Sequence, residues 1–481
     1  MKITKTTPQT FTNAGALTNA LMFLDTNAMA NATLIDLGAM VIPRTYIDTK
    51  ERNKYAGAET FIREFTGTLI VCLSSGILAK ALAHSANRFI DPSTKINPNS
   101  WFTKDSAAAL KKAWNGGTEG FVNNILDNLS GRDNTAITKL TNKDAVAQKL
   151  AAYINAEKPD KAAAKQIEDL ITNDLKANRS VNVNINGTEL NTSLEHLIRD
   201  MPDMGKNIFN NKNINVESAF KKIAKVNKIK TLGALGIASG LGLANQYVNR
   251  KITEKRTGVK GFAGDFDYQN FIKSKKSQKD DSLGFKLQKG LVSAGIIGLA
   301  AAVMRIRNPK DFVKKLEFAS PIVSGNAIKT VYTATLVGRF LASDNKQELG
   351  ETAFRDYFGF LNWLVLGGFA SKAVANIIDP HKKELFNINK EGKGIKHWLN
   401  DITVKSHKEA AANGVKMWKI NAAQIAGLAY STLMLGVVLT RLNVLFSKQK
   451  QAKEQTAQTT QNTICFPPQM PEAFKGLKVT L

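Results

Sequence analysis

Six stretches of the chain are apolar and rich in glycine and alanine, and polar, lysine-rich segments separate them. They cover residues 26–43, 65–79, 231–249, 290–304, 357–371 and 420–440, and a weaker seventh covers 321–338. A helix needs about 20 mainly apolar residues to cross a bilayer, whereas 10–14 residues are typical of a buried helix in a soluble protein. The third and sixth stretches reach the spanning length. The 15-residue stretches lie between the two cases, because flanking lysines can extend their ammonium groups to the headgroups.

A polar segment, residues 93–226, separates the second and third apolar stretches. Its pattern predicts short helices at 145–156, 161–176 and 192–200, and a short strand at 181–187. We therefore expect an inserted, mainly helical soluble lobe.

The chain also contains a repeat of its own sequence. Residues 59–83 and 351–375 match at a constant offset of 292, with identical residues at nine positions and acidic Glu64 opposite Asp356. Weaker matches pair Arg44 with Arg339 at an offset of 295, and Arg250 with Arg441 at an offset of 191. The smaller offset means that the first copy carries about 101 extra residues, which fall within the polar segment and support an insertion.

These patterns predict an all-α fold, with an internally duplicated, membrane-embedded helical body and the inserted lobe. The predicted parts are, in order, 10–92 (two helices of the first copy), 93–226 (the lobe), 227–252 (third helix of the first copy), 253–287 (a basic aromatic linker), 288–447 (a helix followed by the second copy) and 448–481 (a disordered tail). If the run at 290–304 crosses the membrane the copies are parallel, and if it does not they are inverted.

The net charge of +26 predicts attraction to anionic surfaces. Residues 93–226 hold 19 Lys/Arg and 15 Asp/Glu, which leaves most of the excess beside the apolar stretches. Basic residues that flank apolar helices favour anionic lipid headgroups as the partner, with nucleic acid as the weaker candidate. The basic loops show no clear asymmetry between alternate sides, which leaves open that some helices are only partly inserted. Helix packing partners or a second copy of the chain are further candidate partners.

Charged residues inside the repeat are the candidate binding site. They are Glu59, Arg63, Glu351, Arg355, Lys80, Lys372, Arg44 and Arg339. Glu59 and Arg63 are spaced i, i+4 on a predicted helix, a pair that contributes a few tenths of a kcal/mol at a surface. The functional alternative is that the repeated pairs line a polar centre between the copies and bind or gate a charged ligand.

Other motifs favour packing over chemistry. Gly236 and Gly240 form a GxxxG pattern that predicts close helix approach, and Asp379-Pro380 predicts a helix end. The histidines lack the spacing of a metal site or a catalytic triad, and patterns such as HExxH, CxxC and GxSxG do not occur. We expect no cofactor and no metal site, and an enzyme is the least supported class.

The leading hypothesis is an integral membrane protein with several spans, no cleavable signal peptide, and a transport-like or structural role. The alternative is a peripheral basic scaffold that binds anionic lipid or nucleic acid at the cytoplasmic membrane surface.

Overall fold

The computed structural model describes residues 15–90, 101–114, 117–127, 140–156, 160–174, 182–185, 188–209, 215–257, 280–318, 324–388, 394, 398, 401–446 and 448–449. The structure is 85% helical with 2% strand, so the predicted all-α class is confirmed. The predicted tail after residue 449 and the aromatic part of the predicted linker, residues 258–279, lie outside the described residues.

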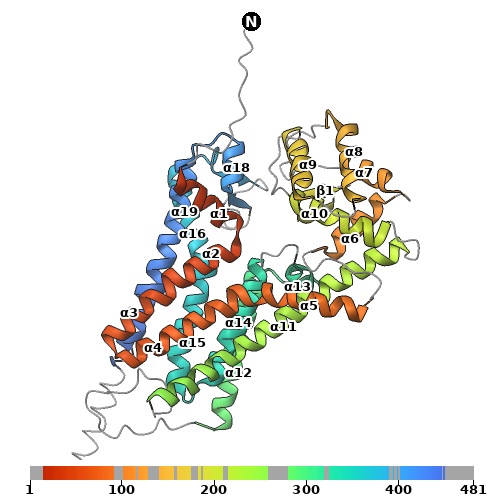
Figure 1. Ribbon diagram of the computed structural model, residues 1–481. Coiled ribbons are helices and arrows are strands. Elements are labelled where there is room, and N and C mark those ends of the chain that lie inside the picture. The colour runs from red at the N-terminus through yellow and green to blue at the C-terminus, as the bar shows by residue number, and fades with distance from the viewer. Residues whose placement is uncertain are drawn as a thin grey trace, which may run out of the picture.

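Seven long helices build the body (Figure 1). Among the described residues they are α2–η2–α3 (Ala28–Ile35, Asp36–Val41, Ile42–Glu51), α4–η3–α5 (Lys54–Thr68, Leu69–Ser74, Ser75–Ile90), α11 (Val216–Thr257), α12 (Leu283–Val303), α14 (Gly325–Ala342), α15–η6–α16 (Lys346–Leu361, Asn362–Leu366, Gly367–Ile378) and α19–η7 (Met417–Thr432, Leu433–Val438), which continues to Phe446. Two short helices, α1 (Ala16–Thr26) and α13 (Pro309–Leu316), flank them.

We call α2–η2–α3, α4–η3–α5 and α11 the first helix set, and α14, α15–η6–α16 and α19–η7 the second. The middle helices of the two sets begin in the same way, with the side chain of Asn53 or Asn345 accepting a backbone N–H three residues on. Each then passes through a π-helical turn, which begins at Leu69 in the first set and at Asn362 in the second. Such turns replace α-helical hydrogen bonds locally and are frequent at functional sites.

The third helix of each set packs against the first helix of the other set. Helix α11 lies along α14 and α5, whereas α19–η7 contacts α16 and the η2 and α3 segments. Glycines permit the close crossings. A Cβ on Gly338 would lie 2.4 Å from the Leu243 carbonyl oxygen, and one on Gly436 would lie 2.4 Å from that of Ala39.

The GxxxG prediction for α11 is wrong within this chain. A Cβ on Gly236 or Gly240 would meet nothing within 4 Å in the described structure. Gly242 makes the close approach instead, because the face of α11 that packs on α14 carries it toward Thr335 and Val331.

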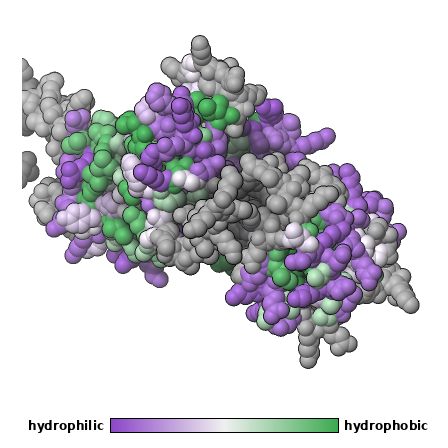
Figure 2. All heavy atoms as spheres, turned by 90° about the horizontal axis from the view of Figure 1, so that it is seen from above, coloured by the Kyte–Doolittle hydropathy of each residue, from purple (hydrophilic) through white to green (hydrophobic). Residues whose placement is uncertain are grey.

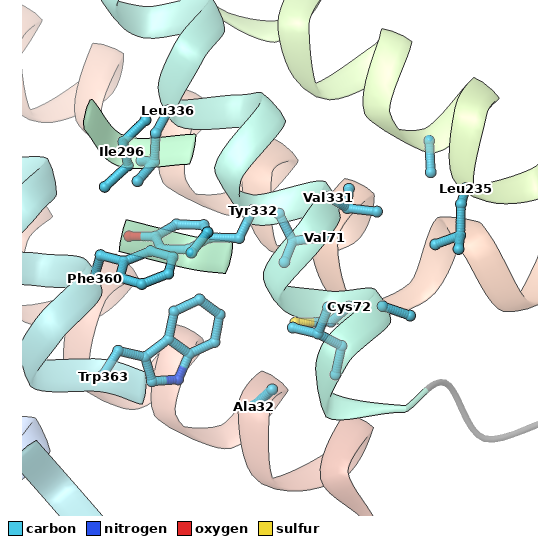
Figure 3. Close-up of a cluster of buried hydrophobic side chains, with 14 of the residues drawn as sticks. Ala32, Val71, Cys72, Leu235, Ile296, Val331, Tyr332, Leu336, Phe360 and Trp363 are labelled. Atoms are coloured by element: carbon cyan, nitrogen blue, oxygen red, sulfur yellow. The ribbon is translucent and has the colours of Figure 1, made fainter. Parts of the chain in front are cut away.

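The core of the body joins both sets (Figure 3). Tyr332 of α14 stacks on Phe360 with ring centroids 6.0 Å apart, and it meets Trp363 edge-on at 4.7 Å. Val71 and Cys72 of the η3 turn belong to the same cluster. Aromatic pairs of this kind add roughly 0.5–1.5 kcal/mol each beyond the area they bury.

A second, separate core lies in the lobe. It is formed by α6 (Lys104–Ala113), α7 (Thr118–Asp127), α8 (Lys143–Ile154), α9 (Lys161–Asp174), α10 (Leu194–Met204) with its π turn η4 (Gly205–Phe209), and the first turns of α11. The predicted strand forms β1 (Asn182–Ile185), which pairs antiparallel with β2 (Thr188–Ser193). Trp114 stacks on Phe209 with ring centroids 4.2 Å apart. Helix α11 continues from this core into the body without interruption.

Lys230 marks the junction of the lobe and the body on α11. Its ammonium group lies 3.7 Å from the centroid of the Trp101 ring. Burial disfavours the charged form and lowers the pKa of Lys230 to about 7, and the nearby charge of Asp200 opposes this only in part.

A third, small core covers the end of α16. There β3 (Phe386–Ile388) pairs with β4 (Ile402–Val404), and α18 (His407–Ala412) follows. Helix α16 ends at Ile378, as the Asp-Pro pair predicts. Burial would raise the pKa of Asp379, but backbone N–H groups of Leu385, Glu384 and Lys383 donate to its carboxylate and hold the pKa below its usual range. A second Asp-Pro pair, Asp91-Pro92, follows the first repeated stretch of the sequence, and it lies outside the described residues.

Four helices of the described chain are long and apolar enough to cross a membrane. They are Lys54–Ala83, Leu283–Val303, Glu348–Ile378 and Met417–Phe446. Three of the 15-residue apolar stretches thus lie in helices of spanning length. The 231–249 stretch is not among the four, because Asn245, Gln246 and Asn249 make that part of α11 more polar, and all three are buried. Hydrophobic residues form patches on the body, whereas the lobe surface is mostly hydrophilic (Figure 2).

Candidate functional site

A buried network of arginines and carboxylates lies where the two helix sets meet. Arg339 of α14 connects them: its Nη2 donates to Glu64 Oε2 at 3.0 Å, and its Nη1 donates to Asp356 Oδ1 at 3.2 Å. Glu64 belongs to α4 and Asp356 to α15, so one guanidinium joins the first set to the second.

Glu64 accepts from two further arginines. Arg44 of α3 donates through Nη1 at 3.3 Å, and Arg63 donates through Nε at 3.2 Å and Nη2 at 3.1 Å, all to Oε1. Asp356 accepts from one further arginine, Arg355, at 3.0 Å. Charge-assisted bonds between guanidinium and carboxylate groups are roughly twice as strong as neutral hydrogen bonds.

The network is almost completely shielded from solvent. The side chain of Arg355 is 12% exposed, and those of Arg44, Arg63, Arg339, Glu64 and Asp356 are at most 6% exposed. Removing one partner from a buried ion pair typically costs 3–5 kcal/mol, because the other charge stays buried without compensation.

The two carboxylates lie at the same depth along their helices. Glu64 is ten residues after Lys54, the first residue of α4, and Asp356 is ten residues after Lys346, the first residue of α15. At 1.5 Å per residue, each carboxylate is about 15 Å from its helix start. This is about half the thickness of a bilayer's hydrocarbon core.

Two more carboxyl groups lie within electrostatic range. Asp36, at the start of the η2 turn, interacts with Glu64, Arg44 and Arg339, and its side chain bonds to Thr68. Glu59, one turn before Arg63, is 2% exposed and acts electrostatically on Arg63. Among the described residues, the cluster therefore contains four arginines and four carboxyl groups.

The η7 turn contributes a backbone acceptor. Arg44 Nε donates to the carbonyl oxygen of Leu435 at 3.2 Å. A π turn changes the local helix hydrogen bonding, which leaves carbonyl groups available to outside donors. The guanidinium of Arg44 is thereby held by a carboxylate on one side and by a backbone carbonyl of the other helix set on the opposite side.

Four of the eight residues predicted from the repeat lie in this network, namely Arg44, Arg63, Arg339 and Arg355, and a fifth, Glu59, lies in the wider cluster. Their direct partners differ from the predicted i, i+4 acids. The ion pairs in the structure join Arg63 to Glu64 and Arg355 to Asp356, the next residue in each case. The reason is tertiary: arginines from other helices converge on those two carboxylates. Glu351 is half-buried on α15.

The two predicted lysines lie apart from the network and differ from each other. Lys80 is exposed. Lys372 is buried and holds the β3–β4 segment against α16: its ammonium donates to the carbonyl oxygens of Trp398 and Ile402, the latter at 2.6 Å, and lies 4.3 Å from the centroid of the Trp398 ring. We assign Lys372 a packing role.

Sequence reasoning did not include Glu64, Asp356 and Asp36 among the candidate site residues. A signal was present for the first two, because they are acidic at matched positions of the repeat and directly follow its repeated arginines. Asp36 interrupts an otherwise apolar stretch, which is also a signal, since a carboxyl group there needs a partner.

Few other side chains among the described residues are arranged like a catalytic or metal-binding site. No group of three or more His, Cys, Asp or Glu side chains in the described part of the chain could hold a metal ion. The buried ring of His407 contacts Asp25 Oδ2 at 3.2 Å and Asn421 Oδ1 at 3.0 Å, which ties α18 to α1 and α19. The arginine network is thus the candidate site, and guanidinium groups are suited to binding oxyanions.

Comparison with protein-family models, with curated proteins and with solved structures gave no match to this chain.

Proposed function

We propose that the chain is an integral membrane protein in which two copies of a three-helix unit enclose the arginine network, and that the network binds a charged solute in transport. The observation that carries this proposal is Arg339, which bonds to a carboxylate of each helix set, each carboxylate lying about 15 Å from the start of its helix. Charged groups within membrane-spanning segments are costly, and they usually mark solute pathways.

Reciprocal contacts support the duplication. Arg44 Nη2 of the first set lies 3.8 Å from the Cβ position of Gly359, and Arg339 Nη2 of the second set lies 3.9 Å from that of Gly67. These four residues are matched pairs in the sequence repeat.

Ion pairs near the ends of the two third helices are also reciprocal. Arg250, near the end of α11, pairs with Asp344 at 2.8 Å, just after the first helix of the second set. Arg441 is its match in the repeat and pairs with Glu51 at 3.5 Å, at the end of the first helix of the first set. The third helix of each unit therefore contacts the first helix of the other unit, which supports two interlocked units.

The direction of the helices supports parallel copies. The run at 290–304 lies almost entirely in α12, a helix long and apolar enough to span. With α12 included, matching helices of the two sets are four long helices apart along the chain, so they run in the same direction if successive long helices alternate in direction. In this arrangement the lobe and the β3–β4 segment lie at the same end of the body.

Membrane fractionation tests the first half of the proposal. Membranes from expressing cells are washed in high salt and then in alkaline carbonate. We expect retention through both washes, because spanning helices do not depend on screened charges. Release by salt alone would contradict the proposal and favour the peripheral basic scaffold that binds anionic lipid or nucleic acid.

Substitution of both repeated arginines tests the second half. Purified Arg63→Gln/Arg355→Gln protein in proteoliposomes is compared with the wild type for uptake of small radiolabelled anions and cations. We expect uptake by the wild type and its loss in the double variant. Absence of uptake by correctly folded wild-type protein across both solute classes would favour a structural role.

A further inference from the structure

The carboxylate of Glu64 is surrounded in the way that proteins surround a bound anion. Three guanidinium groups reach it from α3, α4 and α14, and both of its oxygens are occupied. Asp356, its match in the repeat, accepts from two arginines through Oδ1. Among the two matched carboxylates, Glu64 therefore occupies the richer arginine site.

The geometry suits a small oxyanion. The guanidinium group is planar and presents several N–H donors that match carboxylate oxygens. Arg63 already uses two of its nitrogens on Glu64 Oε1, and Arg339 approaches the other oxygen. A free carboxylate placed at this position would meet the same donors.

The balance of charge in the cluster favours replacement of the Glu64 carboxylate by a free anion whenever the side chain leaves its position. The described residues of the cluster include four arginines and four carboxyl groups, and three of the arginines bond to Glu64, so their positive charge would be in excess if its carboxylate left. An uncompensated charge is strongly unfavourable in a buried site, so an anion from solution would be attracted to the vacated position.

We propose that Glu64 is a tethered occupant of an oxyanion site, and that a small free carboxylate takes the place of its side chain when solute binds. This inference rests on the proposed role of the network as a solute-binding centre, and it names the solute class. Because a tethered group has a high effective concentration, Glu64 weakens binding of the free anion in the wild-type protein and keeps the site closed when solute is absent.

The test compares purified full-length wild type with Glu64→Ala, which removes the tethered carboxylate and leaves space for a free one. Glu64→Gln is included because it keeps the shape of the side chain and is less demanding for folding. The unfolding temperature is measured against increasing sodium propionate or formate, with sodium chloride at the same ionic strength as the reference.

We expect saturable stabilisation of Glu64→Ala by the carboxylates and not by chloride. The half-saturating concentration should be at least tenfold higher for the wild type and intermediate for Glu64→Gln. The surface control is Glu195→Ala, which removes the partner of exposed Arg199 and should show no carboxylate-specific shift.

Three results would each overturn the inference: no carboxylate-specific stabilisation of either Glu64 variant, no saturable effect on the wild type, or equal rescue of Asp356→Ala. The last result would mean that any broken ion pair of the network is repaired by any carboxylate. The titration needs no membrane, so it can fail while the protein still passes the fractionation test, and the reverse also holds.

Discussion

Replacement of Arg339 by methionine is the most direct test of the network's contribution to stability. The side chain is 4% exposed and bonds to carboxylates of both helix sets. Methionine fills a similar elongated volume, so the main loss is the guanidinium and not the packing.

The expected cost follows from what remains behind. Glu64 keeps Arg44 and Arg63 on Oε1, but its Oε2 loses the Arg339 bond, and Asp356 keeps Arg355 alone. Loss of one partner from a buried pair costs roughly 3–5 kcal/mol. At about 2–4 °C per kcal/mol, the unfolding temperature should fall by on the order of 10 °C.

The assay is thermal unfolding in detergent, followed by tryptophan fluorescence and by circular dichroism. The matched control is Arg199→Met, which removes an arginine from an exposed i, i+4 pair with Glu195. That change should cost less than about 1 kcal/mol.

A second variant tests whether the cost comes from uncompensated charge. Arg339→Met/Asp356→Asn again has equal numbers of arginines and carboxyl groups, so it should be more stable than Arg339→Met alone. The reasoning is refuted if Arg339→Met unfolds within about 2 °C of the wild type, or no lower than the Arg199→Met control.

Three further predictions concern other parts of the chain. Lys230 has a pKa of about 7 in the folded protein and a higher pKa in the unfolded chain, so the unfolded state binds more protons above pH 7 and the free energy of unfolding rises with pH toward 10. In urea titrations, Lys230→Met should remove this rise, which amounts to at most about 1.4 kcal/mol per pH unit. An unchanged dependence of stability on pH in the variant would contradict the low pKa of Lys230. Gly338→Ala should lower the unfolding temperature, since the new Cβ would lie 2.4 Å from the Leu243 carbonyl oxygen. Gly298→Ala on α12 is the control and should be neutral or stabilising, because its Cβ would meet no described atom within 4 Å. Similar effects of the two variants would argue against the close crossing of α14 and α11. Phe121→Ala in the lobe core should cost about 3–5 kcal/mol, and in calorimetry it should lower a lobe transition while the body transition stays in place, whereas a shift of both would mean that the two cores unfold together.

The helices were predictable because their signals are local. Apolar runs and the Asp-Pro stop at Asp379 act within a few residues of each helix. The lengths of the helices that are long and apolar enough to span were less predictable, because charged residues inside them, such as Arg63 and Glu64, end an apolar run in the sequence but are buried and paired in the fold.

The candidate site was predictable in part. The matched sequence positions identified all four arginines of the network, since each arginine of one helix set has an arginine at the matched position of the other set. It assigned them partners by helical spacing alone, and this assignment missed Glu64 and Asp356 as their direct acceptors.

By itself the sequence determined the all-α class, the excess of basic residues and the matched positions of the two helix sets, because composition, periodicity and self-similarity are properties of the chain. Only the tertiary structure decided which charges meet. Glu64 and Arg339 are 275 residues apart, and they come within 3.0 Å because α14 lies against the first helix set. A buried charge pairs with whichever opposite charges lie close to it in the folded protein, because no water is present to solvate it. The number of residues between two charges in the sequence does not determine the distance between them in the fold.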